Sequence, residues 1–124
     1  MPMRQFQHTV TAEDTSVVVG SGDLDVLATP RLITWCENAA FQVCQQSIDA
    51  DHTTVGTTIK MEHVRGSAVG TELTVHCAEP INDGRRLVCH LRVTDSEGEE
   101  LARGEVHRAV VDPDRFMRKC QSVS

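Results

Sequence analysis

Three side chains in this sequence suit acid–base or nucleophilic chemistry by type and position. Glu37 is the only acidic residue between Pro30 and Ile48, in an otherwise apolar stretch. A buried, isolated carboxylate is typical of a working acid or base, although a solvent-facing charge would give the same pattern. His63 falls on the same side of its segment as the apolar residues before it. This position suits either a core histidine or a functional base. Thr29 stands directly before Pro30, where a helix cap is the simplest interpretation.

Other chemistry-bearing residues are more scattered. Arg108 shares parity with Val106 and Val110, so we expect it to point inward and to need an anionic partner; an ion pair on an edge strand is the alternative. No His-x-x-x-His or Glu-x-x-His spacing is present, so no metal site is predicted. The sequence also lacks a Gly-x-Ser-x-Gly elbow, a P-loop and a dinucleotide fingerprint.

One helix must carry two of these residues. Thr29 is a favourable N-cap, Pro30 then occupies the first helical position, and apolar residues follow through Ile48. The apolar residues do not keep to one stripe, which predicts a helix over about 30–47 that is buried on most sides.

From Thr54 onward the apolar period changes to two, as expected for strands. The face of the first such strand that should meet the helix carries Val55, Thr57, Ile59, Met61 and His63. Further alternating segments cover 72–77, 86–93 and 101–111, with turn signals at 82–84 and 96–98. Pro113 ends the last strand, and the tail 114–124 is polar apart from Phe116-Met117. A short first strand over 5–10, one long helix and four antiparallel strands predict an α+β fold.

Composition narrows the class of protein. The 124 residues predict one domain, 1–124, and the net charge of −6 gives no electrostatic footprint for nucleic acid or an anionic membrane. No segment has the length of a membrane span or the pattern of a signal peptide. Five cysteines without a Cys-x-x-Cys pair indicate buried, reduced thiols. We therefore expect a cytoplasmic protein.

Four stretches resemble the fluoroacetyl-CoA thioesterase type of hot-dog protein: Val26-Leu27-Ala28-Thr29, Trp35-Cys36-Glu37, 55–63 and 104–111. The most specific feature is a threonine, a glutamate eight residues later, and Gly-x(6)-His. The resemblance covers about Val26 to Phe116. It implies a hot-dog fold, in which an antiparallel sheet wraps one long helix, and a homodimer.

The same resemblance assigns roles to individual residues. It implies that Thr29, Glu37 and His63 are catalytic and that Gly56 and Arg108 line the substrate site. It also implies an acyl-CoA substrate, with coenzyme A as part of that substrate and no separate cofactor. The loop before Thr29 lacks the aromatic residues of the fluoroacetyl-specific enzyme, so we expect a different short acyl group.

Thioester hydrolysis needs a nucleophile or activated water, a base, and donors to the oxyanion. We expect Glu37 to be the base or nucleophile, Thr29 to attack or orient water, and His63 to be its proton partner. The N–H of Gly56 is a candidate oxyanion donor. Candidate cations for the coenzyme A phosphates are Arg65, Arg85, Arg86, Arg115, Arg118 and Lys119. A hot-dog hydratase or dehydratase and a non-catalytic acyl-CoA-binding module are the alternatives.

Helix geometry constrains how the site is assembled. Eight residues at about 1.5 Å each separate Thr29 and Glu37 by about 12 Å along a helix, too far for a direct contact. Either the chain before Pro30 folds back, or the threonine and glutamate of one site come from different subunits. We expect the second arrangement.

Overall fold

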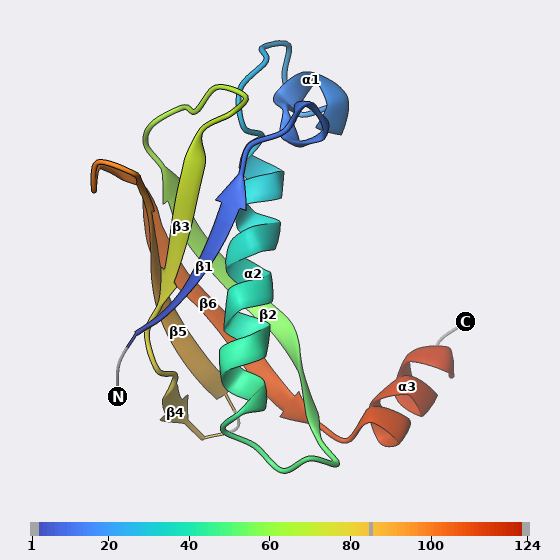
Figure 1. The fold of residues 1–124 in the computed structure, drawn as a ribbon. Helices are drawn as coiled ribbons and strands as arrows, with labels where there is room; N and C mark the ends of the chain where they lie inside the picture. Colours follow the sequence, from blue (N-terminus) through green and yellow to red (C-terminus); the bar gives the residue numbers. More distant parts are fainter. Residues whose placement is uncertain (1–2, 85, 123–124) are drawn as a thin grey trace.

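The computed structural model describes residues 3–84 and 86–122. Its strands are β1 (Arg4–Thr9), β2 (Thr53–His63), β3 (Glu72–Cys77), β4 (Ile81–Asp83), β5 (Arg86–Asp95) and β6 (Glu100–Val111). Its helices are the 3-10 turn η1 (Ala12–Asp14), α1 (Ser16–Val19), α2 (Thr29–Gln45) and α3 (Pro113–Gln121). The antiparallel sheet has the order β1-β3-β5-β6-β2, with β4 beside β5 (Figure 1). Among the described residues five strands follow α2 instead of the predicted four, because Asn82 and Asp83 of the predicted turn belong to the short strand β4, which pairs with β5.

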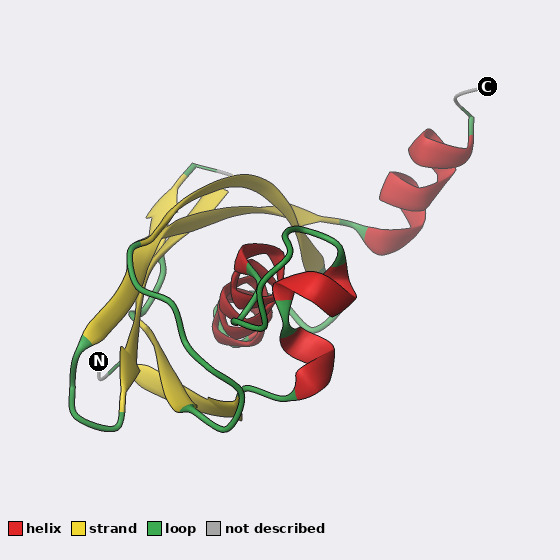
Figure 2. Ribbon diagram, turned by 90° about the horizontal axis from the view of Figure 1, so that it is seen from above, coloured by secondary structure: helices red, strands yellow, loops and turns green. Residues whose placement is uncertain are grey.

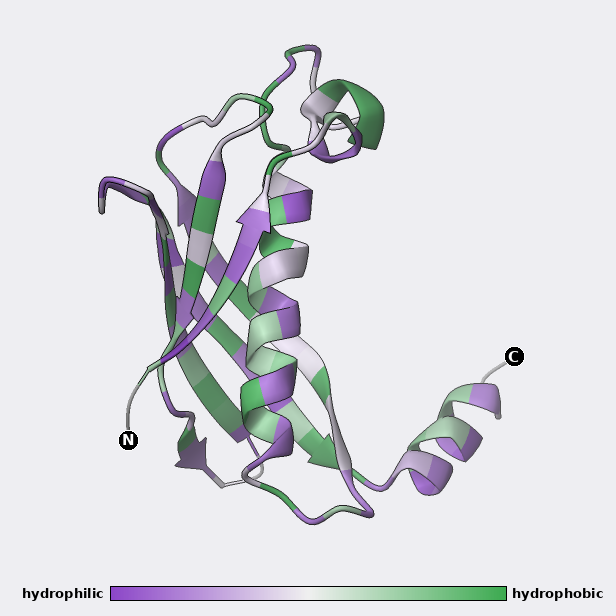
Figure 3. Ribbon diagram, in the orientation of Figure 1, coloured by the Kyte–Doolittle hydropathy of each residue, from purple (hydrophilic) through white to green (hydrophobic). Residues whose placement is uncertain are grey.

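The sheet curls around α2, which lies in its concave face (Figure 2). Buried residues of α2 form one stripe with helical spacing: Leu32, Trp35, Cys36, Ala39, Ala40, Val43 and Cys44. They pack against the inward side chains of β3, β5 and β6, and the alternation of polar and apolar residues is visible along β3 (Figure 3). The prediction that α2 is buried on most sides is wrong for the single chain. Thr34, Asn38 and Phe41 lie on an exposed flank, because the sheet reaches only one side of the helix.

The start of α2 differs by one residue from the prediction. The carbonyl of Ala28 accepts hydrogen bonds from the N–H groups of Arg31 and Leu32, so Ala28 is the N-cap and Thr29 is the first helical residue. Thr29 makes no capping hydrogen bond to the main chain. Its hydroxyl is therefore available for another partner.

A bulge in β2 corrects the predicted face of that strand. The register against β6 shifts between Gly56 and Thr58, so Thr57 is an extra residue. Gly56 is paired with the inward-facing Arg108, whereas Ile59 is paired with the buried Val106. Inward positions are thus even-numbered before the bulge and odd-numbered after it. A strict period of two places Val55 on the inner face, but the bulge gives that position to Gly56.

The polar segment after Asp112, for which the sequence predicted no element, forms α3. Asp112 caps α3 by accepting a hydrogen bond from the N–H of Arg115 at 3.0 Å, and Pro113 occupies the first turn. The predicted end of β6 before Pro113 is confirmed. The Asp-Pro pair is the sequence signal that would have predicted this helix.

Candidate active site

Thr29 and His63 form the first part of the site. The start of α2 lies against the end of β2, and the Oγ1 of Thr29 is 2.8 Å from the Nδ1 of His63. Burial lowers the pKa of His63, opposed in part by the main chain at Arg65, so the ring is neutral at pH 7. Its Nε2 is buried and has no hydrogen-bond partner among the described residues. A neutral imidazole beside a hydroxyl can accept that hydroxyl's proton.

Glu37 and Arg108 form the second part. The Nη1 of Arg108 lies 3.3 Å from the Oε2 of Glu37, and the Glu37 side chain keeps 38% of its surface exposed. The expectation of a buried, isolated carboxylate is therefore wrong: Glu37 is half-exposed and paired. The expectation that Arg108 points inward toward an anion is confirmed, because Glu37 is that anion.

Gly56 lies directly against Glu37. A Cβ at position 56 would overlap the Oε2 of Glu37, so only glycine lets the carboxylate lie this close to β2. This close contact with Glu37 explains why position 56 is a glycine.

Thr54 is a site residue that the sequence did not reveal. Its Oγ1 accepts a hydrogen bond from the Nε of Arg108 at 2.8 Å, and its carbonyl accepts one from Nη2 at 2.9 Å. The guanidinium also lies over the Phe41 ring, 5.5 Å from the centroid. Arg108 is thus held from three sides with Nη1 directed to Glu37. Thr54 could have been identified from the sequence only if the bulge were known, because the bulge turns its side chain inward.

The two parts do not meet within one chain. No hydrogen bond of the described residues joins Thr29 or His63 to Glu37 or Arg108. The separation follows from α2 itself, since eight helical residues span about 12 Å. One chain therefore contains two half-sites on the same helix.

A small pocket marks the glutamate half-site. It has a volume of about 260 Å³ and is lined by Thr34, Glu37, Asn38, Phe41 and Arg108. A larger cavity of about 690 Å³ is lined by residues of β2, β5 and β6 and contains none of the predicted site residues.

The candidate phosphate-binding cations are dispersed. Arg65 is paired with Glu99 at 3.2 Å, and Arg86 is exposed on β5. Arg115, Arg118 and Lys119 lie on α3, whereas Arg85 falls outside the described residues. Arg31, for which the sequence suggested no role, forms an ion pair with Asp14 at 3.2 Å and thereby links α2 to η1.

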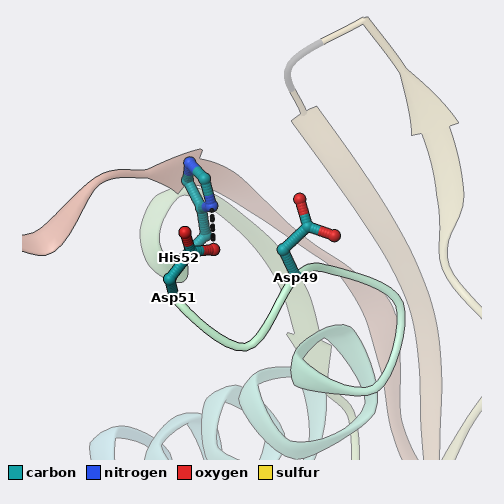
Figure 4. Close-up of side chains that lie close together, drawn as sticks. All are labelled: Asp49, Asp51 and His52. Atoms are coloured by element: carbon teal, nitrogen blue, oxygen red, sulfur yellow. Dashed lines mark hydrogen bonds and ion pairs between the residues drawn. The ribbon is translucent and has the colours of Figure 1, made fainter.

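One group of possible metal ligands was missed by the search for histidine spacings. Asp49, Asp51 and His52 bring ligand atoms within 4.8 Å of one another in the loop between α2 and β2 (Figure 4). The Nδ1 of His52 already contacts Asp51 at 2.9 Å, and both aspartates are exposed. Exposed acidic groups of this kind are common without an ion, and this group shares no residue with either half-site.

All five cysteines are free, as predicted; the prediction that they are buried is correct for four and wrong for Cys120, which is exposed on α3. Burial raises the pKa of the Cys36 thiol to about 12. The hydrogen bond with Cys89, together with burial, raises the pKa of Cys44. No helix of the described chain is long and apolar enough to cross a membrane.

Solved structures with the same architecture define the class of protein. The chain is similar to a variant of the fluoroacetyl-CoA-specific thioesterase FlK in complex with fluoroacetate and CoA, at 21% identity and a TM-score of 0.86, over 95% of this chain and 96% of that chain. A hot-dog-like protein from Thermanaerovibrio acidaminovorans is 18% identical, with a TM-score of 0.86 over 96% and 87% of the two chains. A Thermus thermophilus protein of the thioesterase superfamily is 16% identical, with a TM-score of 0.85 over 98% and 93%. The predicted hot-dog fold is confirmed.

The sequence itself gives the family. Residues 10–114 match the fluoroacetyl-CoA-specific thioesterases, and this chain belongs to that family. A comparison with curated protein sequences found no match.

Proposed function

We propose that the protein hydrolyses a short-chain acyl-CoA thioester to the free acid and coenzyme A. The observation that carries this proposal is the 2.8 Å contact between the Thr29 hydroxyl at the start of α2 and the half-buried His63 at the end of β2, whose pKa burial lowers. A hydroxyl activated by an imidazole is a common arrangement for acyl transfer. Membership of a thioesterase family supports the same reaction class.

We propose that His63 transfers a proton in this mechanism. In the tautomer that carries its proton on Nε2, Nδ1 accepts a hydrogen bond from Thr29 or from a water that Thr29 orients. The carboxylate of Glu37 either attacks the carbonyl carbon or deprotonates the attacking water. If water attacks, its oxygen forms the new C–O bond, the C–S bond breaks, and the coenzyme A thiolate leaves and takes up a proton. If Glu37 attacks, the new C–O bond joins the acyl group to its carboxylate as the thiolate leaves, and water then cleaves this anhydride to release the free acid and restore Glu37. The positive end of the α2 dipole lies at Thr29 and favours the oxyanion that develops.

We further propose that each site is assembled across a homodimer interface, because one chain separates its two half-sites. The strand β2 has 11 residues and forms an edge of the sheet, so one long side is free to pair. A two-fold axis perpendicular to the sheet would pair β2 antiparallel with β2 of a second copy.

The bulge restricts the register of this pairing. Residues opposite each other in an antiparallel pair face the same side of a sheet, so Gly56 must lie opposite an inward-facing residue of the other strand. The inward-facing residues are Thr54 and Gly56 before the bulge and Ile59, Met61 and His63 after it. We propose a register in which Gly56 lies opposite one of the residues after the bulge. Glu37, which lies on Gly56, is thereby carried toward the end of the partner strand where Thr29 and His63 meet.

Turnover of a panel of acyl-CoA thioesters, followed by release of free thiol, tests the reaction. Thiol release with formation of the free acid is expected. Addition of water to an enoyl-CoA without thiol release would instead identify a hydratase. Tight binding of an acyl-CoA without any product would identify a binding module.

Mixing of inactive subunits tests the interface. Thr29→Ala and Glu37→Gln homodimers each contain only damaged sites, but a heterodimer contains one site with neither substitution. Random exchange should restore about a quarter of the wild-type activity, because half of the dimers are mixed and each has one intact site. Verified exchange without recovery would mean that each site takes both residues from one chain.

Substrate choice is expected to differ from that of the family's namesake. The segment before Thr29 reads Gly-Ser-Gly-Asp-Leu-Asp over 20–25 and contains no aromatic residue. Fluoroacetyl-CoA should therefore not be preferred over acetyl-CoA by more than about a hundredfold, the range that small changes in an apolar pocket supply. A larger ratio of the two kcat/KM values would contradict this interpretation of the segment.

The free cysteines fit a reducing compartment, so we place the enzyme in the cytoplasm.

A further inference from the structure

The helix α3 contributes no residue to the core of its own chain, as far as the structure describes it. None of its residues is buried, and it projects from the end of β6 beyond the edge of the sheet formed by β2 (Figures 1 and 2). Phe116, Met117 and Cys120 follow helical spacing and form an apolar stripe, and Met117 is 49% exposed. Arg115, Arg118 and Lys119 outnumber the single acidic residue, Asp114, so the helix has a net charge of +2. A short amphipathic helix of this kind needs a surface that covers its apolar stripe.

A suitable surface exists at the opposite end of the fold. We call residues 12–25 the cover segment, because they lie over the start of α2; the Ala28 N–H bonds to the Asp14 carbonyl. Its exposed apolar side chains include Val17 at 49%, Val18 at 57% and Leu24 at 66%. Its charged residues are all acidic, namely Glu13, Asp14, Asp23 and Asp25. Both its apolar surface and its charge therefore complement α3.

The cover segment of the same chain is out of reach. The strand β6 ends at Val111, which is paired with Thr53 at the beginning of β2. The cover segment lies near the other end of β2, since Leu27, just after it, bonds to Ser67, just after His63. The 11 residues of β2 span about 33 Å, whereas the nine residues of α3 span about 14 Å. The helix cannot cross this distance within its own subunit.

Antiparallel pairing of two β2 edges removes this distance. It puts the Thr53 end of one strand beside the His63 end of the other, so α3 of each chain emerges next to the other chain's cover segment. We propose that α3 is an arm that packs on the cover segment of a second copy of this chain, beside that copy's Thr29 and His63. This inference rests on the homodimer proposed above. Each subunit would then close the entrance of the other subunit's site.

The exposed thiol of Cys120 on α3 provides a direct test. We would introduce a single cysteine into the cover segment of the full chain, as Leu24→Cys or Val18→Cys, and oxidise mildly without substrate. The matched control is Ile81→Cys on β4, which is 57% exposed and distant from the proposed contact. The measurement is the fraction of covalent dimer on a non-reducing gel. Each variant is also prepared a second time with Cys120→Ser, to show whether Cys120 forms the bond.

The arm predicts several-fold more covalent dimer for at least one cover-segment variant than for Ile81→Cys, and loss of that excess in Cys120→Ser.

A charge exchange gives a second test on the more efficient variant. Arg118→Glu with Lys119→Glu should lower the yield of cross-link, and Asp23→Lys with Asp25→Lys in the same chain should restore it. Loss of a contact with coenzyme A would not produce this pattern, because no coenzyme A is present.

Oligomer mass and thiol release, measured on the reduced protein, separate the possible failures. If the protein is a dimer but its cover-segment variants cross-link no better than the control, the proposal for α3 is wrong and the proposal of a dimer stands. Disulfides within single chains overturn it as well, since α3 would then contact its own subunit. A monomer that still hydrolyses acyl-CoA overturns the arm and the interfacial site but not the thioesterase activity.

Discussion

Glu37 owes its position to a contact with main chain and a contact with a fixed cation. The carboxylate lies on Gly56 and is 3.3 Å from Arg108, whose other nitrogens are held by Thr54. A pocket opens beside it, so the carboxylate is both oriented and accessible. This combination is expected of a group that works on a substrate.

The first prediction concerns this carboxylate. Glu37→Gln should lower kcat by about 10² to 10⁴, the usual contribution of a positioned acid–base group or nucleophile. The thermal midpoint should change little, because the amide can still accept a hydrogen bond from Arg108. Glu72→Gln, at an exposed position at the start of β3, is the control for a general loss of charge. Near-normal turnover of Glu37→Gln would mean that Glu37 is only an ion-pair partner.

The second prediction concerns the pH dependence of His63. Burial lowers its pKa below the ordinary 6.5, so the neutral base predominates above pH 6.5 and is lost as the pH falls through the lower value. The value of kcat/KM should therefore rise with pH along a limb whose midpoint lies below 6.5. Residual activity of His63→Gln should lack this limb. A midpoint above 6.5 would assign the limb to another group or require a stabilised imidazolium.

At the scale of elements, the bulge in β2 decides which residues face α2. Because of the extra residue at Thr57, both parts of the strand face inward with different residues. These are Thr54 and Gly56 before the bulge and Ile59, Met61 and His63 after it. An unbroken alternation would offer either the glycine or the histidine to the helix, but not both. The bulge is therefore part of the site.

The third prediction follows from the contact between β2 and α2. Gly56→Ala should reduce activity at least tenfold, on the order of what misplacing a reacting group costs, because the new Cβ displaces the Glu37 carboxylate. The cost in thermal stability should be smaller in a Glu37→Ala background, where the overlapping atoms are absent. Gly66→Ala is the matched control, since a Cβ there meets nothing within 4 Å. Equal stability costs in both backgrounds would place the strain elsewhere.

At the scale of the whole molecule, the core combines aliphatic side chains with thiols. Cys36, Cys44, Cys77 and Cys89 are buried, and only Cys120 is exposed among the five. Inside the core, burial holds the Cys36 pKa near 12, far from the range in which a thiolate forms at neutral pH.

The fourth prediction uses this contrast. A thiol reagent at pH 8 should modify one cysteine rapidly in the native protein and all five after unfolding. Mass spectrometry should locate the fast adduct on Cys120, and Cys120→Ser should remove the fast phase. Rapid modification of Cys44 or Cys89 in the native state would mean that the core opens far more readily than this packing allows.

Local patterns in the sequence were sufficient for α2 and the long strands and for their order, but not for α1, β4 or α3. The apolar run after Pro30 predicted α2, and alternation with turn residues predicted the long strands, because helical and strand periods depend on near neighbours. The residues Thr29, Glu37 and His63 were found through their types and their resemblance to a family. The inward direction of Arg108 followed from parity alone.

Only the tertiary structure decided how these residues combine. The bulge at Thr57 depends on the register between β2 and β6, which no local period encodes. The contact of Thr29 with His63 joins residues 34 positions apart, and that of Glu37 with Arg108 joins residues 71 apart. Such contacts form only when the sheet closes around α2. The separation of the two half-sites along α2, which supports a site built from two subunits, is likewise a property of the folded chain.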